Sequence, residues 1–347
     1  MDLNQVLKAL VHERADLVRG LVLVMVFRPA AYLLPRSLIW CLAVAVAAPM
    51  VVLQSNGRRM TRDMSASFAV GWPAALRMAI RSHAKRFNEF ALQQKMIAGW
   101  YRPSRLPVHI EAREEARQIA AGVGSFILAQ AHFERATAGA AVFFPETFNG
   151  RRIAAVAVSL PRWIPLPHLW RASLQLRQVL RACFAVRPQG LEIVYIGGAL
   201  KRLASRLRTE NIVVSINIDA HWARDKSTSL ERPFCGSLHR TFSTGAAKMA
   251  RLGAVPLMLA LPVLEDDRRG IRMRLFGPYV SNAADPEQRD LEVTNAMLDT
   301  VEREVGIRPC DYVLEIGAER RWDADAQRWV PFPATALDTL SLPGAIT

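Results

Sequence analysis

The sequence predicts an α/β fold, with a mixed, mainly parallel sheet flanked by helices and a hydrophobic N-terminal helical region. Two observations predict the sheet. From about residue 105 short apolar runs of strand length recur, and they alternate with segments of helical length. A third observation predicts the N-terminal region, because residues 38–53 form a run of 16 without a single charge. The hydrophobic content of 51% excludes a disordered chain.

The N-terminal region contains two apolar stretches. Residues 20–27 form the first, Arg28 and Pro29 interrupt it, and residues 38–53 form the second, which contains Pro49. A helix that crosses a bilayer needs about 20 apolar residues, so the longer stretch is short for that purpose. One short spanning helix, a shallow hairpin and a helix lying in the interface all remain open. Attachment to a membrane is expected in each case and is favoured over a buried core helix of a soluble protein.

The remaining elements follow from the periodicity of the apolar residues. Residues 58–100 are expected to be helical, with basic residues on the faces that the apolar residues leave free. Strands are predicted over residues 125–131, 153–158, 191–196, 212–218, 255–261 and 271–276. Helices are predicted over residues 138–144, 169–184, 199–208, 241–252 and 285–305. Asp285 is the expected N-cap of the last helix, and Pro286 is its expected first residue.

This pattern divides the chain into three parts. Residues 1–57 are the membrane-associating region. Residues 58–335 form the α/β domain, helical over 58–104 and built of sheet and helices over 105–335. Residues 336–347 are a tail.

The charge indicates an acidic partner. The formal net charge is +14, and most of the 45 basic residues are arginine, which binds phosphate through a planar fork of donors. Nucleic acid, anionic lipid and an acidic carrier protein would all fit. No zinc finger, aromatic RNA-binding motif or dense basic run supports nucleic acid, so none is expected. The four cysteines show no metal-binding spacing and are expected to be reduced thiols. No metal or other cofactor is predicted.

Two polar residues follow predicted strands directly. His132 ends the apolar run 125–131, and Asp219 ends the run 212–218. Functional residues of such sheets lie at the carboxyl ends of the strands. A histidine there suits a general base, since it titrates near neutral pH. A structural histidine and a turn-forming aspartate are the simpler interpretations of each residue alone.

A second block follows Asp219. It contains the run Arg232-Pro-Phe-Cys-Gly236 and then the run Thr241-Phe-Ser-Thr-Gly245, which is expected to open a helix. Backbone N–H groups at such a helix start could hold an anion, although ordinary capping explains the same residues.

Together these blocks resemble the bacterial lipid A late acyltransferases, the lauroyl/myristoyl transferase branch of the lysophospholipid acyltransferase superfamily. The resemblance covers roughly residues 35–322. It rests on a strand ending in His132, on Asp219-Ala220, on Pro233-Phe-Cys-Gly236, on Thr241 to Ala246, and on Gly253-Ala-Val-Pro256. It implies that His132 removes a proton from a lipid hydroxyl, which then attacks an acyl thioester.

The family places an acid five residues after the histidine, where this chain has Thr137, and a glycine two residues after it, where this chain has Glu134. The family's C-terminal histidine is also absent. Glu134 is the first candidate for the missing acid, and Asp219 and Glu231 are alternatives if they approach in space. The predicted catalytic residues are therefore His132 and Glu134. The predicted substrate-binding residues are Asp219, Arg232, Gly236, Thr241 and Gly245.

The expected function is transfer of a fatty acyl group from acyl carrier protein or acyl-CoA to a hydroxyl or amine of a lipid or glycolipid acceptor. The expected location is the cytoplasmic face of the bacterial inner membrane. An inactive relative that binds lipid or serves as a scaffold in an envelope lipid or polysaccharide pathway is the main alternative. A peripheral protein that binds anionic membrane or nucleic acid through its arginines is a third.

Overall fold

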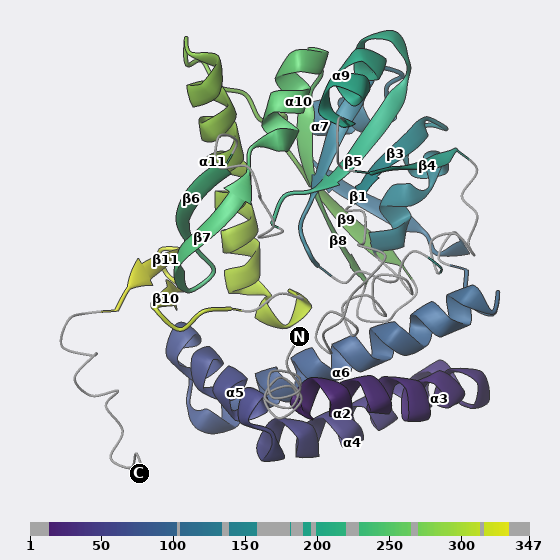
Figure 1. Ribbon diagram of the computed structural model, residues 1–347, viewed down its shortest axis with the longest axis vertical. Helices are drawn as coiled ribbons and strands as arrows, with labels where there is room; N and C mark the ends of the chain where they lie inside the picture. The colour runs from purple at the N-terminus through teal and green to yellow at the C-terminus, as the bar shows by residue number, and fades with distance from the viewer. Residues whose placement is uncertain are drawn as a thin grey trace, which may run out of the picture.

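The computed structural model describes residues 14–102, 105–133, 139–157, 181, 190–195, 199–219, 229–264, 270–312 and 316–332. A layer of N-terminal helices lies against an α/β unit built on one large sheet (Figure 1). The fold class predicted from the sequence is confirmed.

The large sheet has seven strands in the order β1-β9-β8-β2-β5-β3-β4. The neighbours from β8 to β4 pair in parallel, whereas β9 pairs antiparallel with β8, so β9 and β1 run in the opposite direction. The strands are β1 (Val108–Ala112), β2 (Phe126–Gln130), β3 (Arg152–Ala157), β4 (Leu191–Tyr195), β5 (Ile212–Asn217), β8 (Leu257–Leu264) and β9 (Ile271–Phe276).

Helices cover both faces of this sheet, which explains why β2 is buried along its whole length. Ile127 and Ala129 of β2 face a core shared with α9 (Ala199–Thr209), α10 (Gly245–Gly253) and α11 (Pro286–Ile307). The alternate residues Phe126 and Leu128 face the other core. That core is shared with α7 (Glu114–Ala121) and the 3-10 turns η3 (Gly139–Phe143) and η4 (Pro145–Phe148). Burial on both faces is typical of parallel sheets and produces continuous apolar runs.

Over the described residues 14–102, the N-terminal layer contains six consecutive helical segments. They are α2 (Arg14–Val22), the π-helical turn η1 (Leu23–Phe27), α3 (Arg28–Leu33), α4 (Arg36–Leu53), α5 (Ser55–Phe68) and α6 (Trp72–Ile97). Small residues bring the long helices together, because Ala43 and Ala47 of α4 share a core with Ala84 and Ala91 of α6. Among the described residues α4 alone is long and apolar enough to cross a membrane, with a mean hydropathy of 2.0, and 28% of it is buried in the structure.

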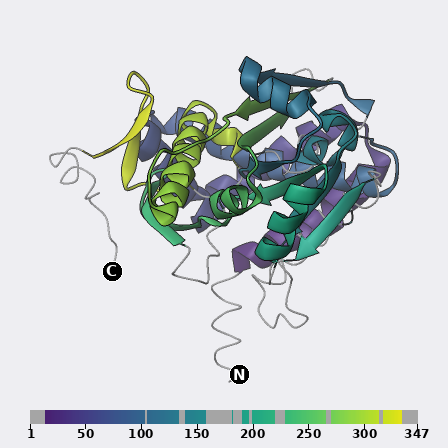
Figure 2. The same cartoon turned by 90° about the horizontal axis from the view of Figure 1, so that it is seen from above.

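The C-terminal segment joins the two layers. Asp311, which ends the turn η6 (Pro309–Asp311), forms an ion pair with Lys85 of α6. The Ser67 hydroxyl donates a hydrogen bond of 2.6 Å to the carbonyl of Gly317. The hairpin of β10 (Arg320–Asp323) and β11 (Arg328–Pro331) lies beside α11 at one end of the molecule (Figure 2). The helical layer is therefore attached to the α/β unit mainly through residues late in the sequence.

Several predicted elements are correct in kind. The strands β2, β3, β4, β5, β8 and β9 and the helix α9 lie where they were expected. Asp285 caps α11 as predicted, because its carboxylate accepts a hydrogen bond of 2.8 Å from the backbone N–H of Gln288. The helix predicted over 138–144 is the short 3-10 turn η3. The helix predicted over 169–184 lies outside the described residues, apart from residue 181.

The helix predicted over 241–252 is wrong in its first part. Residues Ser237–Ser243 form strand β7, which pairs antiparallel with β6 (Ser229–Phe234), and the helix α10 begins only at Gly245. The reason is the turn between these strands, where Cys235 and Gly236 both have positive φ angles, of 46° and 82°. Two such residues make the tight reversal that a two-residue hairpin requires. Pairing with β6 then keeps the following residues extended.

Candidate functional site

His132 and Asp219 meet at the carboxyl edge of the sheet. They follow β2 and β5, which are parallel neighbours with Gln130 opposite Asn217. The apolar residues of β2 and β5 are mostly buried, and each apolar run ends where its strand leaves the sheet. The two polar residues that come next are therefore delivered to the same place, although 87 positions separate them in the sequence.

Asp219 holds His132 through two hydrogen bonds. The backbone N–H of His132 donates to Oδ2 of Asp219 over 2.8 Å, and Nδ1 of the ring lies 2.5 Å from Oδ1. A carboxylate only accepts hydrogen bonds, so the ring proton belongs on Nδ1. Asp219 is completely buried, whereas the His132 side chain keeps some exposure. The Nε2 atom is thus the unprotonated nitrogen of the neutral ring, in the tautomer that a general base requires.

Asn217 lies on the other side of the imidazole ring. It is the last residue of β5, its side chain is exposed, and its Nδ2 atom is 3.5 Å from Nε2 of His132. The polar residues behind it face inward, where the Gln130 amide donates to the hydroxyl of Ser215 and both side chains are buried. Only Asn217 of this polar group therefore reaches the reactive nitrogen.

A buried tyrosine packs behind the pair. Phe133 and Tyr312 form an isolated antiparallel bridge, and their rings are 5.5 Å apart. Burial, together with the negative charge of Asp219, raises the pKa of Tyr312 well above its ordinary value. Tyr312 therefore remains a neutral phenol. Because it directly follows Asp311, which pairs with Lys85, the edge that carries His132 lies close to the helical layer.

Glu134, the predicted catalytic acid, lies outside the described residues, as does Thr137. Asp219, which the sequence analysis assigned to substrate binding and also considered as a replacement acid, is the carboxylate that contacts the His132 ring. Glu231, the other alternative, is exposed on β6, and its carboxylate lies 3.7 Å from His239.

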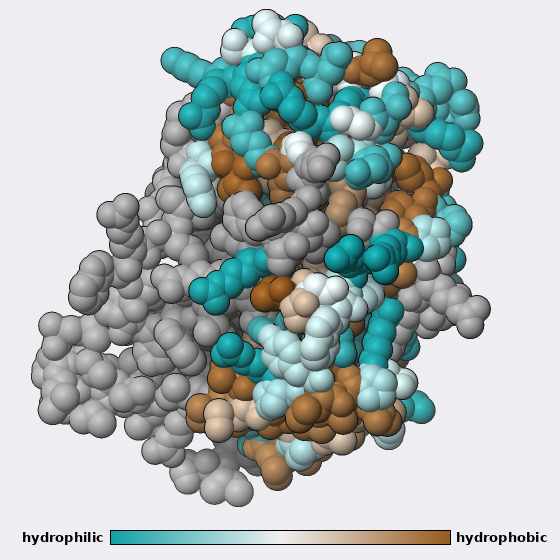
Figure 3. Space-filling model, turned by 90° about the vertical axis from the view of Figure 1, so that its right-hand side faces the viewer, coloured by the Kyte–Doolittle hydropathy of each residue, from teal (hydrophilic) through white to brown (hydrophobic). Residues whose placement is uncertain are grey.

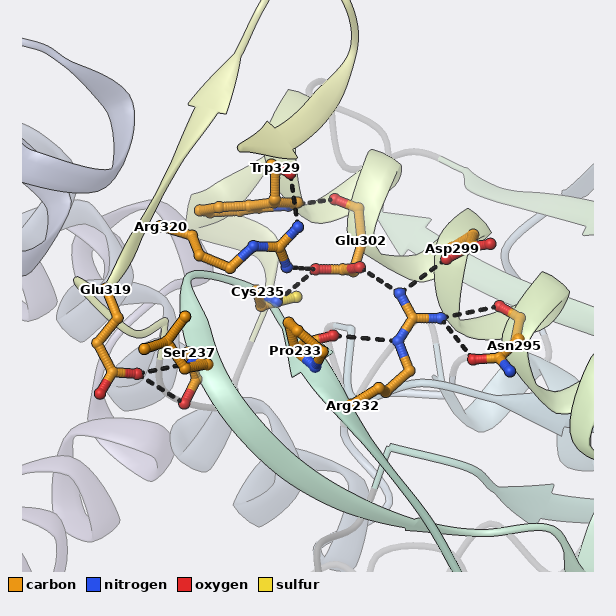
Figure 4. Close-up of polar contacts among 11 residues, drawn as sticks. Arg232, Pro233, Cys235, Ser237, Asn295, Asp299, Glu302, Glu319, Arg320 and Trp329 are labelled. Carbon is orange, nitrogen blue, oxygen red and sulfur yellow. Dashed lines mark hydrogen bonds and ion pairs between the residues drawn. The ribbon is translucent and has the colours of Figure 1, made fainter. Parts of the chain in front are cut away.

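Arg232, predicted to bind substrate, is held by protein carboxylates (Figure 4). Its Nη2 atom is 2.6 Å from Glu302 and 2.7 Å from Asp299, and its Nη1 donates to the side chain and backbone of Asn295. These partners all lie on α11. In this structure Arg232 anchors the β6–β7 hairpin to that helix, and its availability to a substrate stays a prediction.

Glu302 is the centre of this network. Besides Arg232, its carboxylate accepts hydrogen bonds from the backbone N–H of Cys235 over 2.7 Å and from Arg320 over 3.2 Å (Figure 4). Burial raises the pKa of Glu302, while the hydrogen bond from Cys235 and the two arginines act in the opposite direction. The network joins the hairpin turn, α11 and the C-terminal hairpin around one buried carboxylate.

Gly236 is required by the fold of the turn. With φ at 82°, its position would place a Cβ atom 2.1 Å from the carbonyl oxygen of Gly317. The backbones are joined there, since the N–H of Gly317 donates to the carbonyl of Cys235 over 2.8 Å. Thr241 lies within β7 opposite Glu231. Gly245 is the first residue of α10, and its N–H donates to the Ser243 hydroxyl over 3.1 Å.

The hairpin nevertheless lies within electrostatic reach of the dyad. Burial is the main reason why the pKa of Cys235 is raised, and the charge of Asp219 raises it further while Arg240 lowers it. The same two charges act on Tyr312. Arg240 of β7, which the sequence prediction did not include, therefore acts on two residues that the charge of Asp219 also reaches.

No protein-family model matches this chain, and no curated protein matches it. Within the described part of the chain, no group of three or more His, Cys, Asp or Glu side chains is arranged to hold a metal ion. The geometry of His132 and Asp219 is suited to proton transfer by an oriented imidazole.

Proposed function

We propose that the protein transfers a fatty acyl group from a thioester donor, acyl carrier protein or acyl-CoA, to a lipid or glycolipid acceptor at a membrane surface. The observation that carries this proposal is the double hydrogen bond by which the buried Asp219 holds His132. An isolated histidine is a weak argument for catalysis, but a histidine oriented by a buried carboxylate has the arrangement of a general base.

The roles follow from this arrangement. Nε2 of His132 takes the proton from an acceptor hydroxyl, whose oxygen forms a bond to the thioester carbonyl carbon. The tetrahedral intermediate then breaks its carbon–sulfur bond, and the departing sulfur receives the proton from the imidazolium. Asp219 keeps the Nδ1 proton in place and stabilises the ring while it is positively charged. The products are an ester and a free thiol, and the proton taken from the hydroxyl ends on the thiol sulfur.

The helical layer supports a membrane location. Large apolar side chains are exposed along it, among them Met25, Leu33, Leu53 and Trp72. Apolar surface gathers over this part of the molecule in the side view (Figure 3). Exposed apolar side chains on a helix are typical of helices that lie in the membrane interface. We propose the cytoplasmic face of a bacterial inner membrane as the location, where thioester donors and lipid acceptors meet.

The test measures acyl transfer from a set of acyl carrier protein and coenzyme A thioesters to a membrane lipid extract. His132→Ala is expected to abolish transfer, and Asp219→Asn is expected to lower the rate about 10³- to 10⁴-fold, because the ring would lose its correct tautomer. His239→Ala is the matched control, since His239 is exposed on the hairpin.

Full activity in His132→Ala would assign the base to another residue. No transfer by the unmodified protein with any donor would favour the alternative, a lipid-binding or scaffolding subunit in an envelope lipid pathway.

A further inference from the structure

Asn217 occupies the position that an acceptor group must reach. Its amide lies 3.5 Å from Nε2 of His132, the atom that would take the acceptor's proton. Because Asp219 fixes the ring proton on Nδ1, Nε2 can only accept a hydrogen bond. The amide must therefore turn its NH2 group toward the ring, and not its oxygen.

The contact between these atoms is weak. Hydrogen bonds of this kind are usually about 2.7 to 3.2 Å long, and the side chain of Asn217 is exposed. An acceptor oxygen that forms hydrogen bonds with both Nδ2 of Asn217 and Nε2 of His132 would thus replace one long contact by two hydrogen bonds of ordinary length. Gln130, directly opposite Asn217, is buried and donates a hydrogen bond to Ser215 in the interior.

A hydrogen bond donated by Asn217 distinguishes a hydroxyl acceptor from an amine acceptor. A hydroxyl oxygen has two lone pairs, so one can accept from Asn217 while the other attacks the thioester, and its proton points to His132. A neutral amine nitrogen has a single lone pair. If that pair accepts a hydrogen bond from Asn217, it is blocked from attack.

We propose that Asn217 is a catalytic residue that positions the acceptor and selects a hydroxyl over an amine. Its N–H donates to one lone pair of the acceptor oxygen and holds that oxygen with its proton toward Nε2 of His132. This inference rests on the proposed function and narrows its acceptor to an alcohol.

The test compares Asn217→Ala with the unmodified protein on two acceptors in mixed micelles, a long-chain primary alcohol and the amine of the same chain length. The unmodified protein is expected to prefer the alcohol. In Asn217→Ala, kcat for the alcohol is expected to fall about 10²-fold, the loss that misplacing a reacting group by about 1 Å can cause. The rate with the amine is expected not to fall, because alanine leaves the amine lone pair unblocked, so the preference for the alcohol collapses. Asn56→Ala, at an exposed position of α5, is the matched control.

A second measurement excludes a merely structural effect. Nitrogen NMR shifts of the His132 ring should show the Nδ1–H tautomer in Asn217→Ala as in the unmodified protein, because Asp219 alone sets it. Equal losses with alcohol and amine, or an unchanged alcohol rate, would overturn the role of Asn217 while leaving the proposed function intact. A complete lack of thioester transfer by the unmodified protein would overturn both.

Discussion

At the scale of single residues, a buried histidine of α6 makes the helical layer sensitive to pH. His83 of α6 is buried, its Nε2 atom accepts from Arg19 of α2 over 3.0 Å, and its Nδ1 lies 3.2 Å from the carbonyl of Ala79. Burial, and then the charges of Arg86 and Arg19, lower the pKa of His83 to about 3. The ring is therefore neutral when the protein is folded.

Acidification should destabilise the protein through His83. The unfolded chain binds a proton at this residue below about pH 6.5, whereas the folded chain binds it only near pH 3. The free energy of unfolding should therefore fall as the pH drops through this range, by up to about 1.4 kcal/mol for each unit. Urea unfolding in detergent between pH 7.5 and 4.5 measures the slope. His83→Gln should flatten it, whereas His109→Gln, at an exposed strand position, should not. Equal slopes in all three proteins would contradict this assignment.

The dyad shows what sequence reasoning can find at this scale. His132 could be predicted because an apolar run ends in it. The partnership with Asp219 depends on the parallel pairing of β2 and β5, which no local pattern contains. The polar end of β5 did carry a signal for Asn217. Asn217 and Asp219 are two positions apart in the sequence, and residues at this spacing on a strand lie on the same face.

At the scale of elements, the β6–β7 hairpin depends on a single carboxylate. Glu302→Ala would leave the mostly buried Arg232 and Arg320 without their shared partner and the N–H of Cys235 without an acceptor. Removing one member of a buried ion pair typically costs about 3–5 kcal/mol, and a loss of that size in the free energy of unfolding is expected. Asp299→Ala is the matched control.

Asp299 pairs with the same arginine, but its side chain is 67% exposed, so a loss below about 1 kcal/mol is expected. Denaturant unfolding of the two variants measures the difference. Similar losses in both would show that the network does not depend on burial.

The hairpin is also the element that sequence reasoning misjudged. Residues 241–252 contain apolar residues at helical spacing, and that period does hold from Gly245 onward. What overrides it before Gly245 is the reversal at Cys235 and Gly236, and Gly317 packs against this turn. A contact with a residue so much later in the chain leaves no trace in the local sequence.

At the scale of the whole molecule, the helical layer should bind membranes through its exposed apolar side chains. Leu33 and Leu53 are 79% and 73% exposed, and burying a leucine contributes about 1.5–3 kcal/mol. Replacing both by glutamate should therefore weaken binding to phosphatidylglycerol-containing vesicles at least about 10²-fold in a flotation assay. Val280→Glu is the matched control, since Val280 is equally exposed but lies in the α/β unit. Equal weakening by the control would contradict a membrane-binding role of the layer.

The apolar run over residues 38–53 predicted α4 and its hydrophobicity. How α4 uses that hydrophobicity could not be predicted, because one face packs its alanines against α6 while other positions remain exposed. The general arrangement of sheet and helices followed from the alternation of apolar runs. The attachment of the helical layer to the sheet did not, since it depends on η6 and the segment after it.

That attachment has a consequence for how the chain folds. Ser67 and Gly317 are 250 positions apart, and Lys85 and Asp311 are 226 apart. During synthesis the N-terminal helices leave the ribosome long before the segment that clamps them to the sheet, at speeds of about 5–20 residues per second. They therefore spend many seconds without their final partner and can engage lipid first. The bilayer would then bind the N-terminal helices of the nascent chain until η6 and the segment after it have been synthesised.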